Sequence, residues 1–250
     1  MRGYFTLFKK ELASYFVSPV AYMVLLATSL VIGVYFWILV NYFINAHIKE
    51  VTILFALFNV PFFWNMIVVM CPVITMRIFS EEFKLGTIEM LLTAPISEWQ
   101  IVLAKFTAAV TFFMIAWSPI LLNMGWLHVA SPEKIQISWG MVVLPFVMLF
   151  LVGSFYLAIG LFTSVLTKNQ IVSAIMSFAL IYVLYSLSFI PFVTQNQDFN
   201  RFFEYTSVLN NMNTFSLGTF DTRPVVYLLS GTGFFLLLTQ RILLSKRLKA

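Results

Sequence analysis

The stretch RIFSEEFKLGTIEMLLTAPISEW, residues 77–99, decides how this chain is interpreted, because it interrupts a sequence that is otherwise mostly apolar. The chain has 15 basic and 10 acidic residues among 250, and six of these charged side chains lie in this stretch. Four of the ten acids are here, namely Glu81, Glu82, Glu89 and Glu98. This concentration of charge predicts that the stretch lies in water, outside the apolar environment that the rest of the chain requires.

The composition of the whole chain excludes a soluble globular domain. Apolar residues make up 61% and charged residues 10%, and the mean hydropathy is +0.93, whereas soluble domains have roughly 45–50% apolar and about 25% charged residues. Six uncharged stretches are each long enough to cross a bilayer, which takes about 20 apolar residues: Val20–Phe43, Val51–Met76, Phe106–Leu127, Gly140–Leu166, Ile171–Val193 and Pro224–Leu238. We therefore expect an all-α integral membrane protein with six transmembrane helices, the last of which extends toward Leu244.

The segment 1–19 is expected to lie on the membrane surface. Aromatic and leucine side chains surround Lys9, Lys10 and Glu11, a pattern typical of an interfacial amphipathic helix over residues 2–16. Ser18-Pro19 should end this helix before the first span. The charges, the length of the apolar run that follows and the missing A-x-A-like site argue against a cleavable signal peptide.

The distribution of Lys and Arg predicts the orientation of the spans. With both termini in the cytoplasm, eleven basic residues lie inside and four outside; the outer four are Lys49, Lys134, Arg201 and Arg223. This orientation makes residues 77–105 a cytoplasmic loop and residues 194–223 an outer loop. We expect a multi-pass protein of the bacterial cytoplasmic membrane.

The loop 77–105 is longer than a simple linker needs to be and carries signals for two short helices. Gly86-Thr87 separates them, Thr87 is placed to cap the second, and Ala94-Pro95 ends it. Ser97 and Gln100 form a capping box that starts the helix leading into the third span. On a helical wheel of residues 78–92, Phe79, Phe83 and Met90 form one stripe, with Glu82 and Glu89 on another face.

Two interpretations of this loop compete. It could lie on the lipid headgroups, or it could dock a cytoplasmic partner. Helices that lie on headgroups favour basic polar faces, so the four acids favour docking. Partners therefore include the lipid bilayer and a cytoplasmic protein, and the basic flanks of apolar segments argue against nucleic acid.

Several chemistries have no support in the sequence. There is no G-x-x-x-x-G-K-[ST] motif, so ATP and Mg²⁺ are not expected to bind this chain. Cys71 is the one cysteine, and His47 and His128 fall short of a usual set of metal ligands; we expect no cofactor or metal.

The first five spans contain no ionisable group except Cys71 and tyrosines, which argues against an ion-coupled carrier. An intramembrane hydrolase is a remote alternative, because serines lie in the fifth span with no base to activate them: Ser173, Ser177, Ser186 and Ser188.

The pattern R-x-F-x-E-E-x-x-x-G-T-x-E-x-L-L-T-x-P, beginning at Arg77, resembles the type-2 ABC exporter permeases, and most closely the gliding-motility-associated and copper-insertion branch. A second stretch, FSLGTFDTRPVVYLLS at 215–230, is similar to the family's run into its last span. The resemblance implies one permease domain over residues 1–250, with an interfacial helix and a cytoplasmic coupling helix between spans two and three. Members of the family often have two adjacent basic residues after the paired glutamates, whereas this chain has Phe83-Lys84.

The resemblance also implies roles for individual residues, none of them catalytic. The ATPase-coupling residues would be Glu81, Glu82, Gly86, Thr87, Glu89, Leu91, Leu92 and Pro95. Of these, Glu81 and Glu82 would hold the loop against its neighbours, including Lys9 and Lys10. Outer-gate candidates are Phe215, Gly218, Asp221 and Arg223, in a region that the family folds back as short helices.

The expected function is an ATP-driven exporter subunit, with ATP hydrolysis on a separate chain. Its partners would be a dimer of cytoplasmic ABC ATPases, a second permease copy or paralogue, and an accessory membrane protein with a periplasmic domain. The alternative is the membrane anchor of an ATP-driven motility or insertion machine that moves no small substrate.

Overall fold

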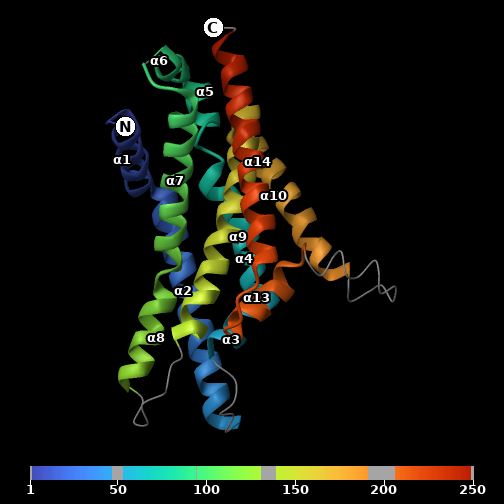
Figure 1. Ribbon diagram of the computed structural model, residues 1–250. Helices are drawn as coiled ribbons and strands as arrows, with labels where there is room; N and C mark the ends of the chain where they lie inside the picture. Colours follow the sequence, from blue (N-terminus) through green and yellow to red (C-terminus); the bar gives the residue numbers. More distant parts are fainter. Residues whose placement is uncertain (1, 47–52, 94, 131–138, 191–205, 249–250) are drawn as a thin grey trace.

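The computed structural model describes residues 2–46, 53–93, 95–130, 139–190 and 206–248, and these ranges are almost entirely helical with no strand (Figure 1). Six helices are long and apolar enough to cross a membrane: Pro19–Asn45, Pro61–Leu85, Glu98–Leu127, Gly140–Leu166, Gln170–Phe189 and Thr222–Arg247. The prediction of an all-α membrane protein with six spans is confirmed. Helix α14 (Thr222–Arg247) continues past Leu244, toward which the last span was expected to extend.

The N-terminal helix is a separate element, as expected. Helix α1 (Arg2–Val17) ends just before Ser18. Helix α2 (Pro19–Ala46) begins with proline at its first position, where the missing N–H costs no helical hydrogen bond. Helix α1 packs along α7 (Glu98–Trp117). The Tyr4 hydroxyl lies 2.8 Å from Thr107 Oγ1, and the Tyr15 ring stacks on Phe112 at 4.8 Å between centroids.

Prolines break two of the expected spans. The second span is divided into α3 (Ile53–Phe58) and α4 (Pro61–Thr75), because the residue before Pro61 disfavours the helical conformation. The Trp64 indole N–H donates to the Phe58 carbonyl at 2.8 Å and satisfies a group that the break leaves free. The third span likewise divides between α7 and α8 (Pro119–Ala130), with Ser118 at the break.

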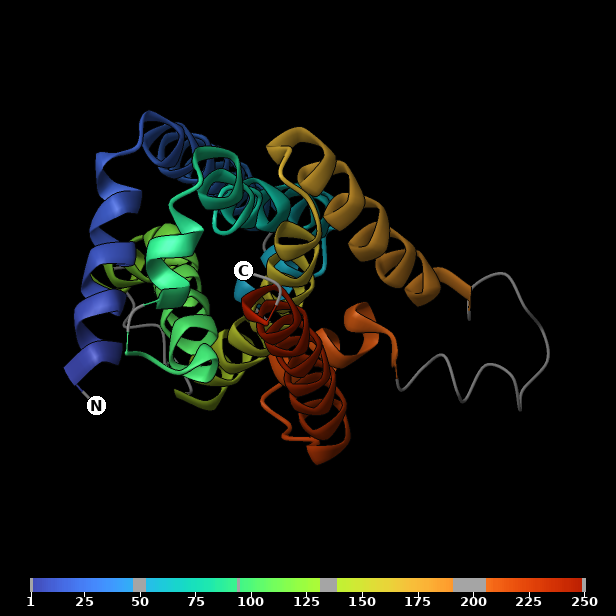
Figure 2. The same ribbon diagram turned by 90° about the horizontal axis from the view of Figure 1, so that it is seen from above.

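The centre of the bundle is α9 (Trp139–Leu166). It packs against α4, α7, α10 (Gln170–Ser186), α13 (Val208–Ser216) and α14, and every residue from 151 to 161 is buried. Helices α2, α10 and α14 expose apolar side chains outward, as lipid-facing spans do. Viewed along the bundle, α1 and α10 lie on opposite sides of this centre (Figure 2). The 3₁₀ turn η1 (Leu187–Phe189) follows α10.

Glycines of the central helices allow close packing. A Cβ atom at Gly160 would lie 2.0 Å from Thr75 Oγ1, and one at Gly153 would lie 2.3 Å from the Phe113 ring. Gly231 of α14 approaches Phe155 in the same way, at 2.5 Å. Each glycine therefore sets the approach of a different helix pair: α9 with α4, α9 with α7, and α14 with α9.

Replacing Gly160 with alanine should destabilise the fold by about 1–3 kcal/mol, the usual cost of forcing atoms into a packed core. The matched control is Gly33→Ala in α2, where no atom lies within 4 Å of the added carbon. The control should be neutral or slightly stabilising, because alanine favours helix over glycine. Thermal unfolding of the purified protein in detergent measures both variants; equal midpoints would contradict the packing argument.

Candidate functional site: the loop between the second and third spans

The charged loop folds into two short helices, α5 (Ser80–Leu85) and α6 (Ile88–Thr93). They lie at the end of the bundle where α1 begins and α14 ends, here called the termini end (Figure 1). Gly86 closes α5 in the left-handed conformation, with φ of 73°. Helix α6 begins directly after Thr87 and ends two residues before Pro95, so the predicted division of the loop is confirmed.

The capping box that starts α7 is also confirmed. Ser97 Oγ accepts from the Gln100 N–H, and the Gln100 side-chain oxygen accepts from the Ser97 N–H, each at 3.4 Å. The helical wheel of residues 78–92, in contrast, is wrong, because the chain turns at Gly86. Phe79 is fully buried whereas Met90 is 78% exposed, so they share no stripe.

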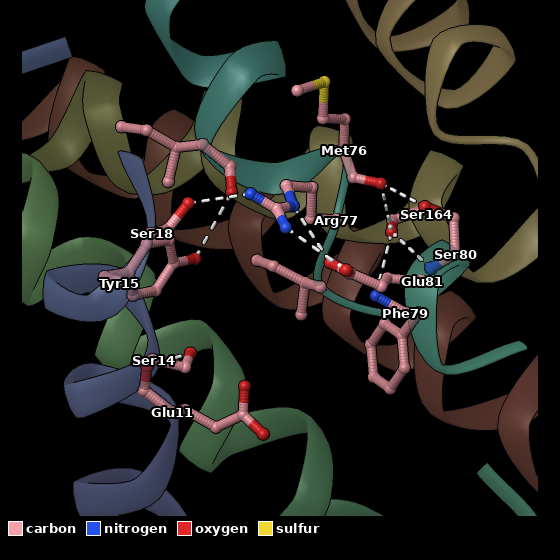
Figure 3. Close-up of polar contacts among 12 residues, drawn as sticks. Glu11, Ser14, Tyr15, Ser18, Met76, Arg77, Phe79, Ser80, Glu81 and Ser164 are labelled. Atoms are coloured by element: carbon pink, nitrogen blue, oxygen red, sulfur yellow. Dashed lines mark hydrogen bonds and ion pairs between the residues drawn. The ribbon is translucent and has the colours of Figure 1, made fainter. Parts of the chain in front are cut away.

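Arg77 joins the start of the loop to the junction of α1 and α2. Its Nε and Nη2 donate to the two carboxylate oxygens of Glu81 at 2.9 and 3.2 Å. Its Nη1 donates to Ser18 Oγ at 2.7 Å (Figure 3). Because the guanidinium is planar, this pairing fixes the direction of the side chain. Glu81 therefore braces α5 through Arg77.

Ser164 of α9 caps α5 from outside the loop. Its hydroxyl accepts from the N–H groups of Phe79 and Ser80 at 3.0 and 3.1 Å (Figure 3). The first N–H groups of a helix have no acceptor within the helix, and a capping side chain from the same segment usually accepts from them. Here the cap comes from the central helix, 84 or 85 positions away in sequence.

Lys105 of α7 connects three elements and was missed as a site residue by the sequence analysis. Its ammonium donates at 2.8 Å to Glu11 of α1, at 2.8 Å to Glu82 of α5 and at 3.1 Å to the Ile78 carbonyl. Its side chain is only 1% exposed. Burying a carboxylate costs free energy unless a cation compensates it, so Lys105 allows Glu11 and Glu82 to leave water. Lys9 and Lys10 were expected to hold the paired glutamates; instead Lys105 pairs with Glu82, and Arg77 pairs with Glu81.

The end of α14 provides a second brace that sequence analysis did not anticipate. Lys246 Nζ lies 3.7 Å from the centroid of the Phe83 ring, a cation–π geometry, and donates to the Val165 carbonyl at 2.7 Å. Arg247 forms an ion pair with Glu98 at 2.5 Å. The sequence does show Lys246 and Arg247 as two adjacent basic residues just after the last predicted span. Because their partners lie far away in sequence, this pair alone could not indicate what it contacts.

These contacts divide the predicted coupling residues into two groups. Glu81 and Glu82 are engaged inside the bundle. Gly86, Thr87, Glu89 and Pro95 are exposed, whereas Leu91 is partly buried against the core; the side chain of Leu92 lies outside the description. Beside α6 is a surface hollow of about 490 Å³, lined in part by Ile88, Lys168 and Lys246. Helix α5 is therefore braced, while α6 presents a free face beside a hollow.

Gly86→Ala should loosen this arrangement without creating a clash. No atom lies within 4 Å of the added carbon, but φ of +73° is strained for alanine, at about 1–2 kcal/mol. Hydrogen exchange of the α5 and α6 amides should accelerate by about 5–30-fold, the factor that corresponds to one or two kcal/mol. Gly86→Asn is the matched control, because asparagine tolerates this conformation; indistinguishable exchange for the two variants would refute the explanation.

The four outer-gate candidates gather at the opposite end, around α13 and the start of α14. Phe215 is fully buried in α13, which packs on α9 and α3. Gly218 has φ of 80° in the turn that follows. Asp221 caps α14 by accepting from the Arg223 N–H at 2.9 Å. Residues 194–205 of the expected outer loop lie outside the described residues.

The alternative chemistries gain no support from the described residues. Ser177 and Ser186 donate to carbonyls of their own helix, which is a packing role. Across the described ranges no group of three His, Cys, Asp or Glu could hold a metal ion. His47 and the side chain of His128 lie outside the described residues.

The fold and the presented loop together define a multi-pass helical membrane protein with a short helix displayed between its second and third spans. Comparison with known families supports this class, since residues 62–242 match the family described as ABC-2 family transporter protein. The chain belongs to this family and is a membrane permease subunit of an ABC transporter. Such permeases are transport subunits, which work with an ABC ATPase, and are not themselves enzymes. A search of curated proteins gives no match.

Proposed function

We propose that this chain is the membrane-spanning subunit of an ATP-driven exporter, and that α6 is the coupling helix that docks on a separate ATPase chain. The observation that carries the proposal is the contrast between the two short helices. Helix α5 is tied to its surroundings by the ion pairs of Glu81 and Glu82. Helix α6 exposes Glu89 and Met90 to a partner.

The bracing supports a mechanism in which motion of α6 reaches several helices together. Through Lys105, α5 is linked to α1 and α7; through Ser164 it is linked to α9, and through Lys246 to α14. Packed elements shift between discrete arrangements more readily than they deform. Closure of the ATPase subunits on ATP would therefore displace α5 as a lever, and the helices bonded to it would follow.

The proposal includes an orientation and an assembly. Both described ends of the chain lie at the same end as α6 (Figure 1), which agrees with the positive-inside prediction that the termini and the loop are cytoplasmic. The membrane would be the bacterial inner membrane, and two permeases, identical or related, would face each other above an ATPase dimer. The motif at Arg77 supports the gliding-motility-associated and copper-insertion branch, with an accessory periplasmic protein as a further partner.

The opposite end of the bundle would hold the outer gate. Helix α13 packs on α9, and its residues Val208, Met212 and Phe215 are buried. A short helix packed in this way can move with α9 when the lever moves. Gly218 and Asp221 would position it, because the first forms the turn and the second caps α14.

The direct test is a Met90→Cys variant, since the native Cys71 is buried and adds no reactive thiol. A membrane-impermeant maleimide should label position 90 only when the cytoplasmic side is accessible. A P-loop ATPase should co-purify with the protein and form a cross-link to position 90. Labelling from the periplasmic side, or a complete complex with no ATPase, would refute the proposal. Transport by a purified complex would favour an exporter over a motility or insertion machine.

A further inference from the structure

A cavity of about 310 Å³ lies at the termini end between α1, α2, α7 and the α4–α5 segment. One part of its wall is charged and contains three cations and three anions: Lys10, Arg77, Lys105, Glu11, Glu81 and Glu82. Figure 3 shows Glu11 on α1 and the Arg77–Glu81 pair across the space from it. The charges balance, so the cavity favours a ligand with no net charge.

The bonds inside the cavity leave specific groups unsatisfied. Lys105 has three donors, and Glu11, Glu82 and the Ile78 carbonyl use all of them. The second carboxylate oxygen of Glu82 is buried and has no hydrogen-bond donor among the described residues. The Glu82 side chain lines the cavity and is 18% exposed, so a turn of its carboxylate brings this oxygen to a ligand. Arg77 uses three of its five N–H groups on Ser18 and Glu81. A primary ammonium would satisfy Glu82, and a phosphate would accept from Arg77 and from Lys10.

The rest of the wall is apolar and belongs to two spans. Val20 and Val24 come from α2 and Val73 from α4. Beyond Val24, the same stripe of α2 continues away from the cavity with Ala27, which is exposed, and Val31, which is partly exposed. An occupant with a charged head could therefore lay hydrocarbon chains along α2. The volume is at the lower end of small-ligand sites, which fits a headgroup and glycerol with the chains outside.

We propose that this cavity binds a zwitterionic phospholipid with a primary amine, of the phosphatidylethanolamine class, from the leaflet at the termini end. Its phosphate pairs with Arg77 and Lys10, and its ammonium donates to the free oxygen of Glu82. Because the headgroup contacts α1 and α5 together, the lipid joins the N-terminal helix to the loop. The inference requires only that the chain spans a bilayer, so it stands or falls independently of the coupling role of α6.

Native mass spectrometry of the complete complex, extracted in mild detergent, tests the proposal. The probes are phosphatidylethanolamine, phosphatidylcholine and phosphatidylglycerol of equal chain length. We expect one retained phosphatidylethanolamine per chain, with at least about fivefold preference over the other two. Val24→Trp fills the cavity and should abolish retention, whereas the matched control Val34→Trp, at an exposed site on α2, should leave it unchanged.

Two further variants keep the test decisive if Val24→Trp fails to fold. Glu82→Gln removes the partner of the ammonium, and should reduce the preference over phosphatidylcholine and phosphatidylglycerol to about twofold or less. Lys10→Gln should weaken retention of phosphatidylethanolamine and phosphatidylcholine alike. Equal or tighter binding of phosphatidylglycerol to the unaltered protein would overturn the proposal, as would retention unaffected by Glu82→Gln and by a folded Val24→Trp.

Discussion

Replacing Lys105 with methionine is expected to cause the largest loss of stability of any single charge removal in the described residues. The ammonium is the buried cation between Glu11 and Glu82, whose side chains are themselves only 13% and 18% exposed. Methionine fills a similar volume but leaves two carboxylates close together without compensation. Breaking a buried ion pair by removing one partner typically costs about 3–5 kcal/mol. The expected result is a protein that expresses poorly or unfolds many degrees earlier.

The cause can be separated from a general loss of packing. The triple variant Glu11→Gln, Glu82→Gln, Lys105→Met removes all three charges, and replacing a whole buried ion cluster is often neutral. It should therefore recover most of the unfolding midpoint in detergent. Lys84→Met, at an exposed position of the same loop, is the matched control and should change stability by less than about 0.5 kcal/mol. If the triple variant is no better than Lys105→Met alone, the electrostatic explanation is wrong.

The features that sequence analysis predicted well depend on short-range rules. The capping box at Ser97 and Gln100 is a local pattern of side chain and backbone, and the structure contains both of its hydrogen bonds. Gly86 ends α5 for the same kind of reason, because its backbone conformation disfavours other residues. The six spans follow from the length of apolar runs alone.

The sequence analysis applied the tendency of proline to end a helix at some positions but not at others. It treated Ser18-Pro19 as a helix break but drew the third span continuously through Pro119, where the structure has a break at Ser118. Pro61 begins a new helix, whereas Pro72 lies inside α4 without ending it. A proline is tolerated inside a membrane helix when neighbours satisfy the freed carbonyl, and that depends on packing that a single sequence does not display.

The bracing of α5 could not be predicted because it depends on contacts distant in sequence. Lys105 was assigned to a water-facing loop, yet its partners lie 94 and 23 positions away and bury it. Lys246 and Arg247 counted only as positive charges for orientation, although they contact Phe83 and Glu98. Counting charges by loop predicts the same orientation with either placement, so the orientation prediction contains no information about these pairs.

The structure also changes which variants test the coupling role. Leu91 is one of the predicted coupling residues, but it is partly buried against the core, so its loss would combine a packing defect with any docking defect. Met90 replaces it as the better probe, since its side chain is 78% exposed and methionine is enriched at protein interfaces. Glu89 remains suitable because it is exposed and forms no ion pair in the described part of the chain.

Glu89→Lys combined with Met90→Ser is therefore expected to separate the permease from its ATPase while leaving the fold intact. Truncating interface hot spots costs about 2 kcal/mol or more, so the yield of co-purified ATPase at limiting concentration should fall at least about tenfold. The permease-dependent stimulation of ATP hydrolysis in nanodiscs should fall in parallel. Exposed substitutions change stability by less than about 0.5 kcal/mol, so the unfolding midpoint should stay constant.

Lys9→Glu, which inverts an exposed charge on α1 at the same end, is the matched control and should retain the ATPase. Undiminished co-purification and stimulation by the double variant would show that α6 is not the docking element.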